Sequence, residues 1–165
     1  MKMSGGITVR KWTPEDAEAS YAVYYDAVRY GATDLYSPQQ CEAWVPSPIV
    51  QDWWLPRLTE DDAWVTSDVH GLTGLIGLRP DGHLDLFFVC SRARGNGTAV
   101  RLYEALIRRA RELGLPKLTT HASLHLRPFL EKRGWQVIST EIVTRMNVQI
   151  ERFEMELPQF PSQTL

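Results

Sequence analysis

The stretch from Gly82 to Gly114 constrains the fold of this chain more than any other segment. Residues 83–90 are almost continuously apolar or aromatic, which is typical of a strand that is buried on both faces. After a glycine-containing loop, apolar residues recur at helical spacing from Ala99 to Leu113, and Gly114 supplies a helix stop. The stretch therefore predicts a buried strand, a loop and a helix that begins directly at that loop.

The loop reads Arg94-Gly95-Asn96-Gly97-Thr98-Ala99 and has the character of an anion site. The first N–H groups of a helix lack intrahelical acceptors and attract negative charge. Glycines let the backbone approach a phosphate without interference from a Cβ atom. A tight strand-to-helix turn without a ligand explains the same glycines, because short glycine motifs occur often by chance.

The same stretch resembles the cofactor-binding core of the GNAT family of acyl-CoA N-acyltransferases. The family motif is Arg or Gln, two residues, Gly, one residue and Gly or Ala, after a strand that ends in an aromatic-apolar pair. Arg94, Gly97 and Ala99 fit this motif, with Phe88 and Val89 at the usual distance upstream. A frame that begins two residues earlier also fits, and the later frame is preferred because Ala99 then opens the helix.

The resemblance implies acetyl-CoA as cosubstrate. Backbone amides from Gly95 to Ala99 would hold its pyrophosphate, and the edge of strand 85–89 would pair with the pantetheine amides as an added strand does. A backbone N–H near Phe88 or Val89 would stabilise the oxyanion. No metal-ligand spacing occurs in the sequence. The cofactor-binding residues implied in this way are Phe88, Val89, Arg94, Gly95, Asn96, Gly97, Thr98, Ala99, Ser123 and Phe129.

A second block supports the same resemblance. Ser123, followed by Phe-Leu-Glu-Lys-Arg-Gly-Trp at residues 129–135, is similar to the fourth helix of GNAT proteins. That helix reads Ser, then Phe-Tyr-Glu-Lys, one residue, and Gly-Phe. The Tyr that often protonates the leaving thiolate in relatives is Leu130 here, so this role is unfilled at its usual place.

The chain is expected to adopt an α/β (α+β) fold of GNAT type, with a mixed, mostly antiparallel central sheet of about six to seven strands flanked by helices. A strand, a helix and a strand in this order favour a parallel crossover, so segments 83–90 and 117–121 should form a splayed parallel pair, with 118–121 beside 87–89. In the last strand the parity of apolar positions changes, which predicts a bulge or chain reversal near Glu151 and Arg152. The expected strands are 7–12, 63–67, 72–79, 83–90, 117–121, 135–141 and 146–157.

The first third of the chain contains the remaining helices and many aromatic residues. Helix starts are expected at Thr13-Pro14 and Ser37-Pro38, the first of these helices ending at Gly31, with a further helical turn or two in residues 49–58. Most of the tyrosines and tryptophans here should pack in the core. In GNAT proteins this region covers the acceptor end of the tunnel. By that analogy, Tyr36 and Trp44 are assigned to substrate binding.

Acyl transfer to an amine requires removal of a proton from the ammonium group. Asp85 is the lone carboxylate in an apolar strand, where burial would raise its pKa, so it is the candidate base. Its spacing places it on one face with His83, Phe87 and Val89. Alternatively, Asp85 caps a turn or pairs with a nearby arginine. His121 is the second catalytic candidate, acting on the thiolate or through a water, and the alternative is a hydrogen-bonded strand-end histidine.

The composition limits the other classes of function. The 165 residues predict a single domain over residues 1–157 and a C-terminal tail over 158–165. A formal net charge of -2 does not favour nucleic acid or an anionic membrane as partner. No apolar run could span a bilayer, and the start lacks a signal-peptide pattern. Two distant cysteines indicate reduced thiols and a cytoplasmic protein.

These observations predict an N-acetyltransferase that moves an acetyl group from acetyl-CoA to a primary amine of a small molecule or peptide. Transfer would be direct, in a ternary complex. The alternative is a non-catalytic acyl-CoA-binding sensor or regulatory module, motivated by Leu130 at the usual Tyr position. Because many GNAT relatives are dimers, the resemblance also suggests a homodimer.

Overall fold

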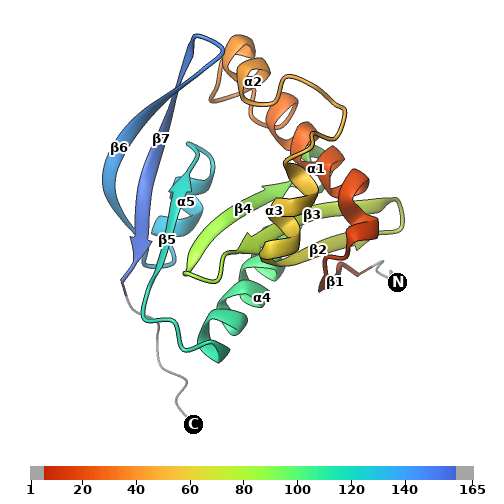
Figure 1. Ribbon diagram of the computed structural model, residues 1–165, viewed down its shortest axis with the longest axis vertical. Helices are drawn as coiled ribbons and strands as arrows, with labels where there is room; N and C mark the ends of the chain where they lie inside the picture. The colour runs from red at the N-terminus through yellow and green to blue at the C-terminus, as the bar shows by residue number, and fades with distance from the viewer. Residues whose placement is uncertain (1–5, 159–165) are drawn as a thin grey trace.

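A computed structural model of the protein describes residues 6–158, which form a seven-stranded sheet with helices against both of its faces (Figure 1). The strand order is β1-β2-β3-β4-β5-β7-β6, and neighbours are antiparallel except for the parallel pair β4 and β5. The expected fold class is therefore confirmed. The expected tail lies outside the described residues from residue 159 onward.

The elements follow the predicted order along the chain. The strands are β1 (Thr8–Lys11), β2 (Asp62–Asp68), β3 (Gly71–Leu78), β4 (His83–Val89), β5 (Leu118–Ala122), β6 (Gln136–Arg145) and β7 (Val148–Leu157). The helices are α1 (Ala17–Arg29), α2 (Pro38–Trp44), α3 (Trp54–Glu60), α4 (Thr98–Glu112) and α5 (Leu126–Glu131), with short 3-10 turns η1 (Pro14–Asp16) and η2 (Ser91–Ala93).

The predicted helix starts at Thr13 and Ser37 are present, and the helices differ from the prediction in detail. Ser37 caps α2, and its hydroxyl accepts the Gln40 N–H at 3.1 Å while the Gln40 side chain accepts the Ser37 N–H at 2.9 Å. At Thr13 the chain first makes the 3-10 turn η1, and α1 follows and ends at Arg29, before Gly31. The third helix begins only at Trp54, later than expected.

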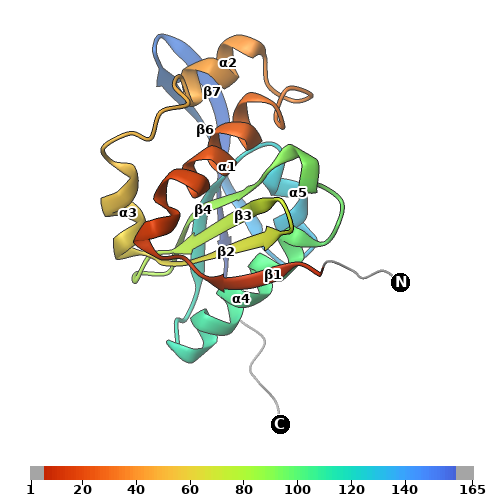
Figure 2. The same cartoon turned by 90° about the vertical axis from the view of Figure 1, so that its right-hand side faces the viewer.

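Helices lie against both faces of the sheet (Figure 2), and the sheet separates two hydrophobic cores. Helices α1, α2 and α3 cover one face, where Trp54 and Leu75 are buried, and helices α4 and α5 cover the other, where Ile76 and Leu102 are buried. The adjacent residues Leu75 and Ile76 thus pack into opposite cores. This burial on both faces explains why the central strands are almost continuously apolar.

The bulge or chain reversal expected near Glu151 and Arg152 is not found there, and the chain reverses earlier, between the end of β6 at Arg145 and the start of β7 at Val148. Both residues pair in register with β6, opposite Ile142 and Glu141, and the β6–β7 register shifts instead between Val137 and Ser139. The alternation of apolar positions in β7 changes because the apolar side chains of its two halves point to opposite faces of the sheet. Ile150 packs into the core under α1 and α2, whereas Phe153, Met155 and Leu157 pack into the core under α4 and α5.

A bulge does occur in β4, and it lies at Asp85. Leu78 of β3 pairs with Leu84 and Gly77 pairs with Leu86, so Asp85 is the extra residue on β4. The alternation of side chains reverses there. His83 and Asp85 line a cavity on the α1 side, while Phe87 and Val89 pack against the core on the α4 side. The expectation that all four share one face is therefore wrong.

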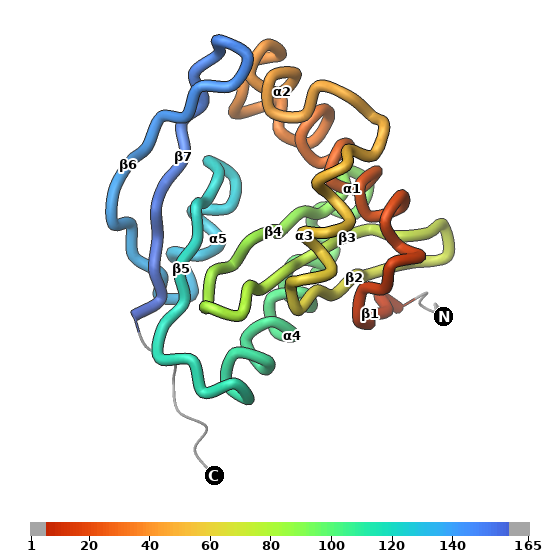
Figure 3. Tube along the Cα trace, in the orientation of Figure 1, coloured from red at the N-terminus to blue at the C-terminus, as the bar shows by residue number. Residues whose placement is uncertain are grey.

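The parallel strands β4 and β5 diverge sooner than expected (Figure 3). The ladder between β4 and β5 contains only two residue pairs, His83 with Thr119 and Leu84 with Thr120. Segments 87–89 and 118–121 are consequently not paired, which corrects the predicted register. From Asp85 to Val89 the edge of β4 that faces β5 has no β-ladder partner there, and this opening positions the candidate site.

Candidate active site

Two cavities meet beside the diverging ends of β4 and β5. The first has a volume of about 670 Å³ and lies mainly between α1, α2 and the β6–β7 hairpin. The second has a volume of about 550 Å³ and lies beside the glycine loop. Trp44, Phe88 and Ser123 line both cavities, so a molecule in one would meet a molecule in the other at these three side chains.

The glycine loop forms one wall of the second cavity. Gly95 and Gly97 have φ angles of 80° and 89°, and a Cβ atom at either position would contact nothing within 4 Å. The glycines are therefore required by backbone conformation and leave open space beside the loop. Gly97 caps α4, so the N–H groups of Ala99 and Val100 in its first turn lack intrahelical acceptors. This arrangement is suited to an anionic group.

Nine of the ten cofactor-binding candidates line the second cavity: Phe88, Val89, Arg94, Gly95, Gly97, Thr98, Ala99, Ser123 and Phe129. Asn96 is the exception. Its carboxamide oxygen accepts the Thr98 N–H at 3.2 Å and the Thr98 hydroxyl at 2.6 Å. The Asn96 side chain thus stabilises the start of α4 and leaves the cavity free.

Aromatic side chains form much of the wall of the first cavity. Tyr36 and Trp44, the two substrate-binding candidates, both line it, with their rings edge to face at 5.4 Å. The Tyr36 hydroxyl donates to the Glu151 carbonyl oxygen at 3.1 Å and accepts the Leu124 N–H at 2.9 Å. These bonds fix Tyr36 between α2, β7 and the segment after β5, whereas Trp44 lies at the junction of the two cavities.

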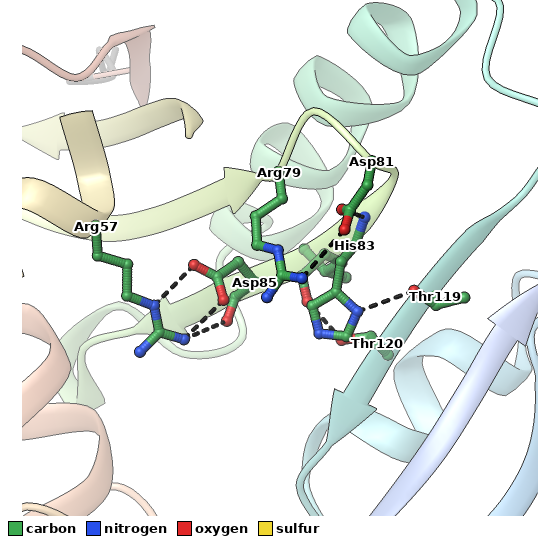
Figure 4. Close-up of polar contacts among 8 residues, drawn as sticks. Arg57, Arg79, Asp81, His83, Asp85, Thr119 and Thr120 are labelled. Atoms are coloured by element: carbon green, nitrogen blue, oxygen red, sulfur yellow. Dashed lines mark hydrogen bonds and ion pairs between the residues drawn. The ribbon is translucent and has the colours of Figure 1, made fainter. Parts of the chain in front are cut away.

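Asp85 lines the first cavity and binds Arg57 of α3 (Figure 4). The guanidinium donates to both carboxylate oxygens, at 2.8 and 2.7 Å, and only 4% of the Asp85 side chain is exposed. Burial by itself would raise the pKa of Asp85, but the hydrogen bonds and the charge of Arg57 hold that pKa below its usual value. The expected upward shift is wrong, and the alternative of an arginine partner is found.

Two histidines also line the first cavity near Asp85. The His83 and His121 rings lie 5.1 Å apart. His83 Nδ1 lies 2.9 Å from the Thr119 hydroxyl (Figure 4). Burial, followed by the charges of Arg79 and His121, lowers the pKa of His83. His121 Nε2 lies 3.8 Å from a Glu141 carboxylate oxygen. The structure therefore brings both catalytic candidates, Asp85 and His121, to the same cavity.

Sequence reasoning missed several residues of this site, above all Arg57 and Tyr24. Arg57 is 28 residues from Asp85 in sequence, so no local spacing rule connects them. A lone carboxylate in an apolar strand signalled the need for a cationic partner without identifying it. Tyr24 belongs to the aromatic residues of the first third, most of which the sequence places in the core. It lines the first cavity and packs edge to face on Phe88 at 4.8 Å. Burial raises the pKa of Tyr24 to about 12, so its hydroxyl is protonated at neutral pH.

Comparison with known proteins gives the family. Residues 32–157 match the model of the acetyltransferase (GNAT) domain. The chain belongs to the GNAT acetyltransferase family. It is 30% identical over 149 residues to YafP of Escherichia coli strain K12, described as an uncharacterized N-acetyltransferase, covering 90% of this chain and 94% of that protein. The resemblance inferred from the glycine loop is thus confirmed.

Solved structures agree with this assignment. A GCN5-related N-acetyltransferase from Rhodopseudomonas palustris superposes with a TM-score of 0.85 at 25% identity, over 94% of this GNAT chain and 97% of the other. The PaiA N-acetyltransferase of Thermoplasma acidophilum, solved in complex with coenzyme A, has the same fold, with a TM-score of 0.75 at 16% identity over 94% and 99% of the two chains.

Three further features bear on the chemistry. Leu130, at the position of the usual Tyr, is fully buried in the core beneath α4 and α5 and lines neither cavity. Within residues 6–158 no group of three or more His, Cys, Asp or Glu side chains is arranged to hold a metal ion. In the same part of the chain, no helix is both long and apolar enough to cross a membrane.

Proposed function

We propose that this GNAT protein transfers the acetyl group of acetyl-CoA to a primary amine of a small molecule or peptide, directly and in a ternary complex. The observation that carries the proposal is the meeting of two cavities at Trp44, Phe88 and Ser123. One cavity has a glycine loop and a helix start that suit an anion, and the other has aromatic walls and a buried carboxylate. Holding two reactants at one junction supplies much of the rate of such a transfer.

The backbone around the second cavity suits coenzyme A. Open space at Gly95 and Gly97 and the free N–H groups at the start of α4 suit a pyrophosphate. The edge of β4 from Asp85 to Val89 lacks β5 as a ladder partner and is available to the pantetheine amides. Two proteins of the same fold support this proposal, because PaiA was solved with coenzyme A and yncA of Salmonella typhimurium with its cofactor acetyl-CoA.

Bound acetyl-CoA would supply an activated thioester carbonyl at the junction. The N–H groups of β4 near Phe88 and Val89 are the proposed donors to the oxyanion. Asp85 and His121 are the proposed acceptors of the amine proton, directly or through a water. Since Arg57 keeps the pKa of Asp85 low, Asp85 is ionised at neutral pH and can accept a hydrogen bond from an ammonium group.

The rival function is a non-catalytic acyl-CoA sensor. It is favoured by Leu130, because a fully buried leucine cannot protonate a thiolate. A sensor would use the second cavity alone, and the aromatic first cavity would have no role in turnover. The two functions differ in whether coenzyme A is released as free thiol.

The deciding experiment incubates the purified chain with acetyl-CoA and a panel of alkyl and aryl amines, with free thiol measured by a chromogenic disulfide and acetylated amine by mass spectrometry. Amine-dependent thiol release is expected. Heat of binding of coenzyme A without thiol release for any amine would identify a sensor. No heat of binding on folded protein would refute both functions.

A variant pair links turnover to the first cavity. Asp85→Asn is expected to lower kcat by about 100-fold, in the range of general acid–base effects. Asp62→Asn is the matched control, because Asp62 pairs with Lys11 and Arg109 and does not line the first cavity. Equal rates for Asp85→Asn and wild type would remove Asp85 from the reaction.

A further inference from the structure

A second carboxyl group, that of Asp61, lines the same outer cavity as Asp85. Asp61 follows the last residue of α3, and Gly77 of β3, the strand next to the Asp85 bulge, leaves room for its side chain. A Cβ atom at Gly77 would come within 2.9 Å of Asp61 Oδ2. The bulge and the glycine together allow two carboxyl groups to meet over one point of the sheet.

Arg57 pairs with only one of the two carboxyl groups, that of Asp85. Arg57 donates to both oxygens of Asp85, and its Nη2 also lies 3.4 Å from the Asp85 carbonyl oxygen. Asp61 Oδ2 is buried and has no hydrogen-bond partner within residues 6–158. Arg57 pairs with Asp85 and Arg79 pairs with Asp81, so neither arginine is bonded to Asp61. A proton held between Asp61 and Asp85 would neutralise this second carboxyl group and satisfy its buried oxygen.

The electrostatics of the pair agree with this geometry. Burial first, and then the neighbouring Asp85 carboxylate, raise the pKa of Asp61 to about 8, while the charges of Arg57 and Arg79 oppose the shift. The pKa of Asp85 moves in the opposite direction. Glu60 and Asp81 are the other acidic residues around the adjoining outer cavity. Two groups with this relation titrate as one unit that keeps one proton at neutral pH.

The pair also connects two spaces. Asp85 lines the first cavity and, in addition, a third cavity of about 610 Å³ on the outer side of α3. Asp61 lines only that outer cavity. The two carboxyl groups therefore form part of the wall between the proposed acceptor site and the outside.

We propose that Asp61 and Asp85 act as one unit that passes the proton of the acceptor ammonium from the first cavity to water in the outer cavity. This inference rests on the proposed transfer to an amine. The ammonium N–H bond breaks as Asp85 takes the proton, and the proton already shared by the pair leaves Asp61 for water. The nitrogen keeps its electron pair for attack on the thioester, and the pair again holds one proton.

Asp61 acts through Asp85 and is a positioning residue for proton transfer. Because Arg57 favours the ionised form of Asp85, that residue alone is a weak base. Release of a proton from Asp61 at the same time avoids a second proton on the pair. This proton relay from Asp85 to Asp61 and on to water is required only for acceptors that enter as ammonium ions. A purely structural role of Asp61 would affect charged and neutral acceptors equally.

The test compares benzylamine, which is protonated at neutral pH, with aniline, which is not. Asp61→Asn keeps a side chain that can hydrogen-bond Asp85 but cannot release a proton. For this variant we expect kcat/KM for benzylamine to fall by about 10- to 100-fold and kcat/KM for aniline to stay unchanged. The control Asp62→Asn should leave both values unchanged. An equal fall for both amines, or no fall for benzylamine, would overturn the relay.

A second measurement does not depend on any acceptor. Carboxyl carbon NMR of the unliganded protein should show Asp61 losing its proton above neutral pH, and Asp85→Asn should lower that midpoint. An Asp61 that is already ionised in mildly acidic solution would refute the shared proton, even with the acetyltransferase activity intact. Failure of every amine in the panel would instead refute the proposed function, and the NMR titration would still decide whether the pair exists.

Discussion

At the scale of single residues, the site depends on how buried charge is balanced. Asp85 looks in sequence like a carboxylate whose pKa burial would raise, and burial does act in that direction. Arg57 reverses the outcome because two short charge-assisted hydrogen bonds favour the ionised form. Asp61 has no arginine partner among the described residues, and burial together with the neighbouring Asp85 carboxylate raises its pKa.

The Arg57–Asp85 ion pair should contribute to stability as well as to the site. Arg57→Gln would leave a carboxylate with 4% side-chain exposure without its partner, and we expect the free energy of unfolding to fall by about 1–3 kcal/mol. Arg79→Gln is the control, because its partner Asp81 is 63% exposed and exposed pairs contribute about 0–1 kcal/mol. Urea denaturation of the two variants measures the difference, and equal losses would contradict the prediction.

Asp61 should make stability depend on pH. Its pKa rises from 3.8, as in an unfolded chain, to about 8 in the fold, so between these values the folded chain holds one more proton than the unfolded chain. Raising the pH through this window lowers the free energy of unfolding, and Asp61→Asn should make the fall less steep by at most about 1.4 kcal/mol per pH unit. The lowered pKa of Asp85 acts only below its usual value, outside this window.

Urea denaturation of wild type and Asp61→Asn between mildly acidic and mildly basic pH checks this dependence. Parallel curves for the two proteins would show that Asp61 is ionised throughout.

At the scale of elements, the strand, loop and helix from β4 to α4 form the central unit. The two ends of α4 have glycines of similar conformation, Gly97 with φ 89° and Gly114 with φ 67°. A Cβ atom at either would contact nothing within 4 Å. Only Gly97 lines a cavity, so the pair separates the cost of backbone strain from the cost of blocking a ligand.

Gly97→Ala and Gly114→Ala should each destabilise the protein by roughly 1 kcal/mol, because alanine is strained at positive φ. Gly97→Ala should in addition weaken binding of coenzyme A, since the new methyl group projects beside the proposed pyrophosphate site. Calorimetric titration with coenzyme A is the measurement. Equal affinities of the two variants would place the diphosphate elsewhere.

At the scale of the whole molecule, a single sheet carries a core on each face and opens at the β4–β5 boundary, where only two residue pairs join the strands. The proposed cofactor would occupy that opening and connect the two halves of the sheet. A dimer, suggested by the family resemblance, remains a prediction.

Coenzyme A should therefore stabilise the folded chain. A ligand at 100 times its Kd adds about 2.7 kcal/mol, which for a domain of this size corresponds to a rise in Tm of roughly 5–10 °C. Differential scanning fluorimetry with coenzyme A, and with adenosine as a control that lacks both the diphosphate and the pantetheine arm, measures the shift. An equal shift with adenosine would contradict binding through the diphosphate and the added strand.

Sequence alone determined the features that depend on neighbours in the chain: the buried strand, the glycine loop, the start of α4, the cap at Ser37 and the family motif. Local spacing and backbone preference decide these features. Of the residues that the sequence assigned to the site, all but Asn96 line one of the two cavities, and the Asn96 side chain is used within its own loop.

The tertiary structure decided everything that depends on register and on partners distant in sequence. The bulge at Asp85 reversed the faces of β4, and β7 changed parity because its halves face different cores. Arg57 lies on α3 and Asp61 directly follows it, so the tertiary placement of α3 brings both residues to the part of the sheet that carries Asp85. Each of these outcomes is set by the packing of two cores against one sheet, which no local pattern encodes.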